Sequence, residues 1–285
     1  MQTSVQARQS SEAGRHTLPP ISPLPRIPDV VPQLRYLREL AMPVALAEAL
    51  EARRIFTRRG LAKTSLLDAR RARIAGLHML PPDVPLDGGL VVDVGANEGS
   101  FVAAALSLAP TAHVLAVEPT ELPLRVLRER FGSHPGVTVV PQALAAEVGT
   151  ARMHVTAAHT GSSLHRPQAA MGELYDAVEG WTVAQEVDVP TTTLDALVGD
   201  REVAVLKIDV QGGELGVLAG GEEALGRTHA ILIEIVFRSH YEGDAPFPVL
   251  HDRLRELGFD LRDVSDLYRR EDGTAMYGDA CFARA

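Results

Sequence analysis

The stretch that decides the fold lies at residues 90–99 and has the sequence LVVDVGANEG. Its first five residues have the apolar, β-branched character of a buried strand, and Gly95 and Gly99 allow a tight turn into a helix. The spacing G-x-N-x-G lacks the third glycine of the dinucleotide-binding motif G-x-G-x-x-G. The stretch therefore predicts a ligand-binding strand–turn–helix unit that differs from a standard dinucleotide site.

Segments of strand and helix character alternate after this stretch. Runs at 113–118, 137–140, 203–209 and 230–236 predict strands, and runs at 99–108, 121–131, 214–225 and 247–257 predict helices. This alternation is typical of βαβ units, so we predict an α/β fold with a mostly parallel, Rossmann-like sheet. Runs at 259–264 and 276–283, joined by a turn at 271–273, predict that the sheet ends in an antiparallel hairpin.

The segment between residues 144 and 189 has a weaker pattern. Gly149 suggests a hairpin turn, and the alternation at 152–156 and 185–189 predicts two strands. The intervening residues 157–180 form a long predicted loop, and loops of this length in compact domains are often functional lids.

The N-terminal part of the chain has a different composition. Residues 1–31 are rich in proline and predict a flexible arm, whereas helical patterns at 44–59 and 65–80 predict a helical extension over 32–87. The main domain is then expected over 88–285. Eight basic residues between Arg53 and Arg73 form either a solvated helix face or a docking surface for an acidic partner or a phosphate-bearing substrate. The extension is also a candidate homodimer surface.

Composition excludes several classes of partner. The chain has 28 Lys and Arg against 37 Asp and Glu, and the net charge of −9 disfavours nucleic acid. No apolar run is long enough for a membrane span, so we expect no membrane partner. A single cysteine, Cys281, cannot form an intrachain disulfide, and the expected compartment is the cytoplasm.

Two acids at predicted strand ends indicate the kind of cofactor. Asp93 lies at the end of the first strand, where it offers an acceptor to a charged or amino-bearing group. Glu118 ends the second strand, about 20 residues on, where an acid can accept hydrogen bonds from both ribose hydroxyls. Together with the atypical glycine turn, these acids favour an adenosyl cofactor without a phosphate bridge, and S-adenosylmethionine is the candidate.

Further motifs occur in an order that resembles one family. They are Asp93 to Gly99, Val117-Glu118-Pro119, Gln142-Ala143-Leu144, Gly161-Ser162-Ser163-Leu164, Thr192-Thr193-Leu194-Asp195, Leu206 to Glu214, Ile233-Glu234, Tyr241-Glu242-Gly243 and Gly278 to Phe282. In these motifs the chain resembles the FkbM-type S-adenosylmethionine-dependent methyltransferases over about residues 90–283. The resemblance implies a class I methyltransferase sheet. One departure is Gln211, where the family usually has Glu.

The resemblance also implies which residues bind the cofactor. Gly95, Asn97 and Gly99 are expected on its methionine and ribose side, and Glu118 is expected at the ribose hydroxyls. The remaining expected cofactor-binding residues are Asp93, Pro119, Gln142, Ala143, Ser163 and Asp209.

Methyl transfer to a hydroxyl requires a base for the hydroxyl proton, and histidine suits neutral pH best. His240 follows the strand that carries Glu234, and it is our first candidate, with Asp209 second and Glu234 also among the expected catalytic residues. Lys207 shares a strand face with Asp209. An ion pair with a purely structural role therefore explains these two residues as well as a catalytic role does. A competing interpretation is that Asp209, Glu234 and His240 hold a divalent metal ion, although no compact metal motif is present.

The expected function is therefore O-methylation of a hydroxyl on a small molecule, such as a sugar or a specialised metabolite. Three alternatives remain. They are an N-methyltransferase, a nicotinamide-dependent oxidoreductase with an atypical glycine loop, and a non-catalytic adenosyl-binding module.

Overall fold

The computed structural model of this chain describes residues 75–169, 181–265 and 267–284. Its strands are β1 (Leu90–Val94), β2 (His113–Val117), β3 (Val137–Val140), β4 (Ala143–Leu144), β5 (Gly149–Thr156), β6 (Val183–Thr192), β7 (Val203–Ile208), β8 (Thr228–Val236), β9 (Phe259–Val264), β10 (Tyr268–Arg269) and β11 (Ala275–Arg284). Its helices are η1 (Leu77–Met79), α3 (Ser100–Leu108), α4 (Glu121–Phe131), α6 (Leu194–Val198), α7 (Glu214–Ala219), α8 (Glu222–Leu225) and α9 (Phe247–Glu256).

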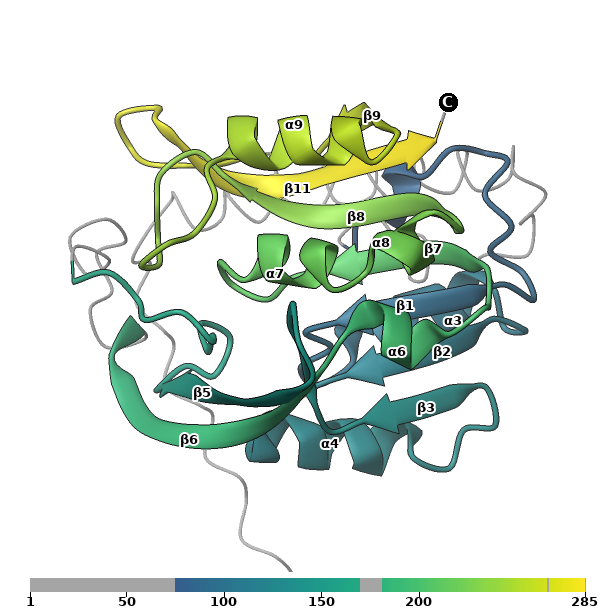
Figure 1. Cartoon of the computed structure of the whole chain (residues 1–285), viewed down its shortest axis with the longest axis horizontal. Helices are drawn as coiled ribbons and strands as arrows, with labels where there is room; N and C mark the ends of the chain where they lie inside the picture. The colour runs from purple at the N-terminus through teal and green to yellow at the C-terminus, as the bar shows by residue number, and fades with distance from the viewer. Residues whose placement is uncertain (1–74, 170–180, 266, 285) are drawn as a thin grey trace, which may run out of the picture. The chain divides into compact units, whose positions relative to one another are not determined.

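The main sheet has the strand order β10-β11-β8-β7-β1-β2-β3, with β9 also paired to β11 (Figure 1). Strands β1, β2, β3, β7 and β8 are mutually parallel, whereas β11 runs antiparallel to β8, β9 and β10. The chain first builds outward from β1 to β3 and then returns to the other side of β1 with β7. Ligands of open α/β sheets bind at such a switch point, outside the carboxyl ends of the strands.

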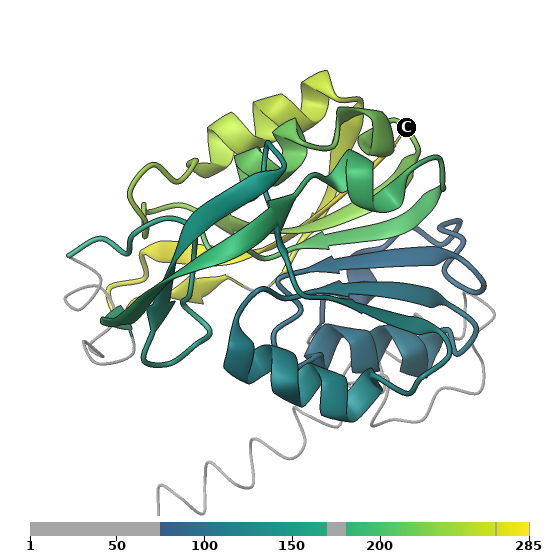
Figure 2. The same ribbon diagram turned by 60° about the horizontal axis from the view of Figure 1, so that its bottom comes forward.

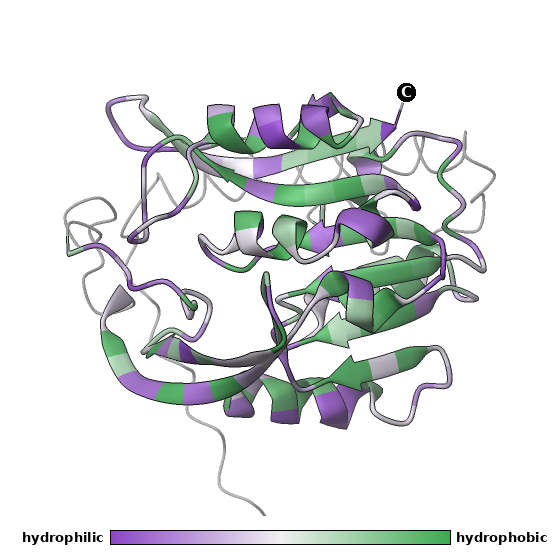
Figure 3. Ribbon diagram, in the orientation of Figure 1, coloured by the Kyte–Doolittle hydropathy of each residue, from purple (hydrophilic) through white to green (hydrophobic). Residues whose placement is uncertain are grey.

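The sheet is buried on both faces, as a central parallel sheet should be. All five residues of β1 are buried, and alternate side chains enter two separate cores. Val91 packs in the core that includes helix α3, and Val92 packs in the core that includes helices α6 to α9. Figure 3 shows the resulting apolar colour of the central strands. The predicted α/β fold and mostly parallel sheet are therefore present.

A second, three-stranded sheet has the order β4-β6-β5. Its long antiparallel pair β5 and β6 extends the two strands predicted at 152–156 and 185–189. Figure 1 and Figure 2 both show this pair beside the carboxyl ends of the main parallel strands. Gly149 is the first residue of β5 rather than a turn residue, and it pairs with Thr191. Of the predicted loop, residues 157–169 are described.

The closing antiparallel pair is also confirmed, because β9 pairs with β11 over Phe259 to Val264. The turn at 271–273 joins the short strand β10 to β11, so it does not connect β9 to β11 directly. No helix in the described part of the chain is long and apolar enough to cross a membrane.

The N-terminal predictions lie almost entirely outside the described residues. This applies to the arm, the helix at 44–59, the basic cluster and any dimer surface on them. The structure describes only the C-terminal end of the helix predicted at 65–80, and there the prediction is wrong. Gly76 is left-handed (φ 72°), and only the 3-10 turn Leu77–Met79 follows it. Leu77 and Leu86 are buried in the core that contains α3, so this end of the predicted extension packs with the main sheet.

Candidate active site

The turn between β1 and α3 brings two strand ends into contact. Gly95 has φ 83°, and a Cβ atom at this position would lie 1.9 Å from the carbonyl oxygen of Asp209. The backbone N–H of Asp209 also donates to the carbonyl of Val94 at 3.0 Å. Only glycine allows this approach, and it places the Asp209 side chain beside the turn.

Gly99 has a packing role. A Cβ atom there would lie 2.5 Å from the Phe131 ring and 2.7 Å from Leu127, so Gly99 lets α3 pack against α4. Gly99 lines neither of the two cavities described below, although we predicted it at the cofactor.

A cavity of about 220 Å³ opens at the carboxyl edge, and we call it the Glu118 cavity. Its wall comes from the β1 turn, the end of β2, the segment at β4 and the loop after β5. It includes most of the predicted cofactor-binding residues, namely Gly95, Asn97, Glu118, Pro119, Gln142, Ala143 and Asp209. Residues distant in the sequence thus meet where an α/β sheet binds its ligand.

The Glu118 carboxylate is fixed by the backbone around it. Its Oε2 accepts from the N–H of Asn97 at 3.0 Å, and its Oε1 accepts from the N–H of Thr120 at 2.8 Å and from the Thr120 hydroxyl. Burial raises the pKa of Glu118, and these hydrogen bonds oppose the rise. The carboxylate is oriented, and its remaining lone pairs can accept from the hydroxyls of a ribose.

A second cavity of about 650 Å³ lies on the other side of the β1 turn, and we call it the Asp93 cavity. Its lining includes Asp93, Phe101, Lys207, Asp209 and Asp279. The Lys207 Nζ lies 3.1 Å from Asp209 Oδ2 and 3.9 Å from Asp279 Oδ1. The ion pair that the sequence suggested between Lys207 and Asp209 is therefore present.

In the Asp93 cavity, Lys207 has carboxylate partners, whereas one oxygen of Asp93 has no hydrogen-bond partner among the described residues. Burial lowers the pKa of Lys207, but Asp209, Asp279 and Asp93 outweigh this effect and raise it above its ordinary value. Burial raises the pKa of Asp93 to about 7, with Lys207 opposing the rise. The Asp93 Oδ2 is buried and has no hydrogen-bond partner among the described residues. A buried polar atom of this kind calls for a partner, and an ammonium group would supply one.

The two cavities share part of their wall. Gly95, Asn97, His159, Thr160 and Asp209 line both. A side chain on this shared wall can contact a molecule in either cavity.

Asp209 is held on both oxygens. Its Oδ2 accepts from Lys207, and its Oδ1 accepts from the Gln211 amide at 2.8 Å. Although burial raises the pKa of Asp209, Lys207 and Gln211 outweigh this and lower it. The same Gln211 nitrogen donates to Glu234 Oε2 at 3.0 Å, and burial raises the pKa of Glu234 well above its ordinary value. The neutral amide at 211 thus bridges two carboxyl groups.

Glu234 and His240 line neither cavity. His240 is 3% exposed, and its ring meets Tyr277 edge-on at 5.9 Å. The Asp244 carboxylate accepts from the N–H groups of His240 and Tyr241 and closes a turn there. Burial lowers the pKa of His240 to about 4. The structure therefore does not bring our first candidate base to the cavities. Among the described residues, no three His, Cys, Asp or Glu side chains gather to form a metal site.

The loop after β5 differs from expectation in two ways. Ser163 is buried, and its hydroxyl donates to the Gln211 carbonyl at 2.6 Å and accepts from the N–H of His165. It lines neither cavity, and its neighbour Ser162 lines the Glu118 cavity instead. His159 and Thr160 line both cavities, and the sequence analysis did not single them out. Their only sequence signal is their place in a long loop before Gly161.

Fold and site together define a doubly wound α/β protein with a cavity at the switch point between β1 and β7. Comparisons with known proteins agree with this class. The model of the FkbM methyltransferase domain matches residues 93–261. The chain is 27% identical over 231 residues to the 2-O-methyltransferase NoeI of Sinorhizobium fredii, covering 77% of this chain and 88% of the relative. It is 32% identical over 170 residues to the 31-O-demethyl-FK506 methyltransferase FkbM of Streptomyces tacrolimicus, covering 52% and 63%.

Solved structures with a similar arrangement include methyltransferase FkbM from Methylobacillus flagellatus, with a TM-score of 0.43 and 14% identity over 67% of this chain and 43% of that one. The magnesium protoporphyrin IX methyltransferase of Synechocystis with bound S-adenosylmethionine has a TM-score of 0.44 and 12% identity over 79% and 84%.

The family match covers more than half of the chain, and the chain belongs to the FkbM methyltransferase family. It is a methyltransferase that depends on S-adenosylmethionine. Membership also decides against the nicotinamide oxidoreductase considered as an alternative.

Proposed function

We propose that this methyltransferase acts on a hydroxyl group of a small molecule, a sugar or a specialised metabolite. The observation that carries the proposal is the wall shared by the Glu118 cavity and the Asp93 cavity, with Asp209 on it. One cavity suits the nucleoside part of the cofactor, and the larger cavity beside it offers space for the rest of the cofactor and for an acceptor. The names of both curated relatives refer to methylation at oxygen positions, which favours a hydroxyl acceptor.

The residues of the two cavities fit S-adenosylmethionine. Glu118 is oriented to accept from the ribose hydroxyls, and the glycine turn at Gly95 leaves the backbone open to close approach. The unpartnered Oδ2 of Asp93 fits the ammonium of the methionine part. The apolar side chains of Leu144 and Met153 in the Glu118 cavity suit the adenine ring. When bound, the cofactor supplies a methyl group that its sulfonium activates for displacement.

The charge of the Asp93 cavity limits the acceptor. Asp93, Glu98, Asp209 and Asp279 bring carboxyl groups to its lining, and Lys207 is already paired. An acceptor with a carboxylate or phosphate near the reacting atom would meet repulsion there. A neutral polyol can donate its hydroxyl hydrogens to these oxygens, so uncharged, hydroxyl-bearing molecules fit best.

Three matched acceptors test this proposal. The full chain would be incubated with ¹³C-methyl S-adenosylmethionine and methyl glucoside, the matching 2-amino sugar or the matching uronic acid, with products identified by mass spectrometry and NMR. Neutral cyclic alcohols such as cyclohexanediol would extend the panel. We expect a methyl ether from a neutral alcohol and little turnover of the uronic acid. A methylamine as the only product would instead support the N-methyltransferase alternative. Calorimetry with S-adenosylhomocysteine separates failure to bind the cofactor from failure to find the acceptor.

A further inference from the structure

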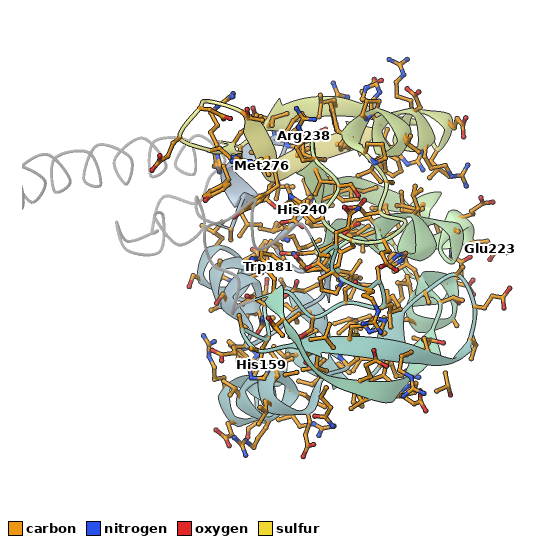
Figure 4. The ribbon with its side chains drawn as sticks, turned by 90° about the vertical axis from the view of Figure 1, so that its left-hand side faces the viewer. His159, Trp181, Glu223, Arg238, His240 and Met276 are labelled. Carbon is orange, nitrogen blue, oxygen red and sulfur yellow. The ribbon has the colours of Figure 1, made fainter. Side chains whose placement is uncertain are left out.

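His159 occupies a special position in the turn that follows β5. It is one of the residues that line both the Glu118 cavity and the Asp93 cavity, and it is the only histidine lining either of them among the described residues. A side chain on this shared wall is positioned to contact a molecule that reacts between the two cavities. His159 and His240 lie apart: in Figure 4, Trp181 lies between them.

The backbone of His159 is held in an uncommon conformation. Its φ of 56° is in the left-handed region, which residues with a Cβ rarely adopt. The N–H of His159 donates to the Thr156 carbonyl at 3.1 Å, and its carbonyl accepts from the N–H of Ser162 at 3.1 Å. These bonds close a tight turn around His159 and fix the direction of its side chain.

The far side of the turn is anchored independently. The Tyr241 hydroxyl lies 3.0 Å from the Gly161 carbonyl, to which it can donate. A Cβ atom at Gly161 would lie 2.8 Å from the Trp181 ring, so the indole packs directly on this glycine. Strained backbone persists where the surrounding structure determines it, and such places cluster at functional sites.

The His159 side chain is half-buried and lines both cavities. Its Nδ1 is buried and has no hydrogen-bond partner, so Nε2 is the ring nitrogen that a bound molecule would meet. The other titratable candidates are committed elsewhere. Both oxygens of Asp209 accept hydrogen bonds, and Glu234 and His240 lie outside the cavity walls. Imidazole is the side-chain base best suited to neutral pH.

We propose that His159 is the general base that removes the proton from the acceptor hydroxyl. This inference rests on the proposed function. The acceptor oxygen forms its bond to the methyl carbon while the carbon–sulfur bond breaks, and the electron pair of that bond stays on sulfur. The hydroxyl proton passes to the lone pair of an imidazole nitrogen, so a neutral ether and a neutral thioether leave a protonated histidine.

Two substitutions at this position test the proposal without disturbing the turn. Glycine and asparagine both tolerate a positive φ, so His159→Gly and His159→Asn should fold. His159→Gly leaves a space for added imidazole, whereas His159→Asn fills much of that space with an amide that cannot take up the proton. The probe is whichever neutral alcohol of the panel above the wild-type enzyme methylates.

We expect both variants to lose at least about 100-fold in turnover, the usual effect of losing a general base, and to bind S-adenosylhomocysteine within about threefold of wild type. Added imidazole should restore His159→Gly at least about tenfold, and more basic imidazoles should restore it further. Imidazole should not rescue His159→Asn or Asp209→Asn. A merely structural role for His159 would give no dependence on the basicity of the added imidazole.

The opposite results are equally clear. Near-normal turnover of His159→Asn, or a folded, cofactor-binding His159→Gly that no imidazole rescues, would overturn the assignment of His159 while leaving O-methylation in place. If the wild-type enzyme forms no methyl ether from any alcohol of the panel, the proposed function fails, and this inference fails with it.

Discussion

Replacing Gly95 by alanine would test whether the close contact between β1 and β7 builds the site. The left-handed backbone at φ 83° alone costs a residue with a Cβ about 1–2 kcal/mol. In addition, the new Cβ would lie 1.9 Å from the Asp209 carbonyl oxygen, so the two strand ends must separate by more than an ångström. Overpacking of this kind costs about 1–3 kcal/mol, and weakening the bond from Asp209 N–H to the Val94 carbonyl adds about 1 kcal/mol. We expect Gly95→Ala to lower the free energy of unfolding by about 3–6 kcal/mol.

Gly273→Ala is the matched control. Gly273 has φ 84°, almost the same as Gly95, but a Cβ atom there meets nothing within 4 Å. The control should therefore show only the backbone cost of about 1–2 kcal/mol. Urea unfolding followed by circular dichroism would measure both variants against wild type. If Gly95→Ala and Gly273→Ala agree within about 1 kcal/mol, the contact with Asp209 does not determine the turn, and our account of Gly95 is wrong.

Three further outcomes are expected. Glu118→Ala should lower the affinity for S-adenosylhomocysteine at least about tenfold in calorimetry, because charged hydrogen bonds contribute about 1.5–3 kcal/mol each; unchanged affinity would refute the ribose assignment. Lys207→Met should cost about 1–3 kcal/mol in urea unfolding, because Asp209, whose side chain is 38% exposed, loses its cationic partner, and adding Asp209→Asn should recover part of the loss; no recovery would contradict the pairing. His240 has a pKa of about 4 in the folded chain, whereas the unfolded chain takes up that proton near pH 6.5. Stability should therefore fall by up to about 3 kcal/mol as the pH falls from 6.5 to 4, and His240→Gln should flatten this fall; the same slope in both proteins would show that His240 is not responsible.

The neutral residue at position 211 has a structural explanation. The Gln211 amide nitrogen donates to Asp209 and to Glu234, at 2.8 Å and 3.0 Å, so it bridges two carboxyl groups that would otherwise face each other. A glutamate here, the residue expected from the family resemblance, would bring a third carboxyl group to the same place. The sequence marked Gln211 as a departure, and the structure gives the reason why the amide is accommodated.

The sequence by itself determined the α/β class, nearly all strand and helix positions of the main sheet, and several residues that line the Glu118 cavity. These features depend on short-range signals. The run at 90–99 is apolar and then rich in glycine, and Glu118 follows at a strand end. Since parallel strands end at the same edge of a sheet, residues at those ends must gather once the strands are located. The strand ends together with the family resemblance predicted Gly95, Asn97, Glu118, Gln142 and Asp209 at one site, and all five line the Glu118 cavity.

Only the tertiary structure decided which loop side chains line the two cavities. His240 and His159 both lie in loops, and nothing in their local sequence says in which direction either ring points. The Asp244 turn directs His240 toward Tyr277, and the hydrogen bonds around Thr156 and Ser162 hold His159 in a left-handed conformation at the shared wall. The conformation of a loop depends on contacts between residues far apart in the chain. The periodicity and spacing of residues in the sequence therefore do not predict it. The sequence could locate the strands that build the site, but the packing of its loops determined that His159 lines the cavities and His240 does not.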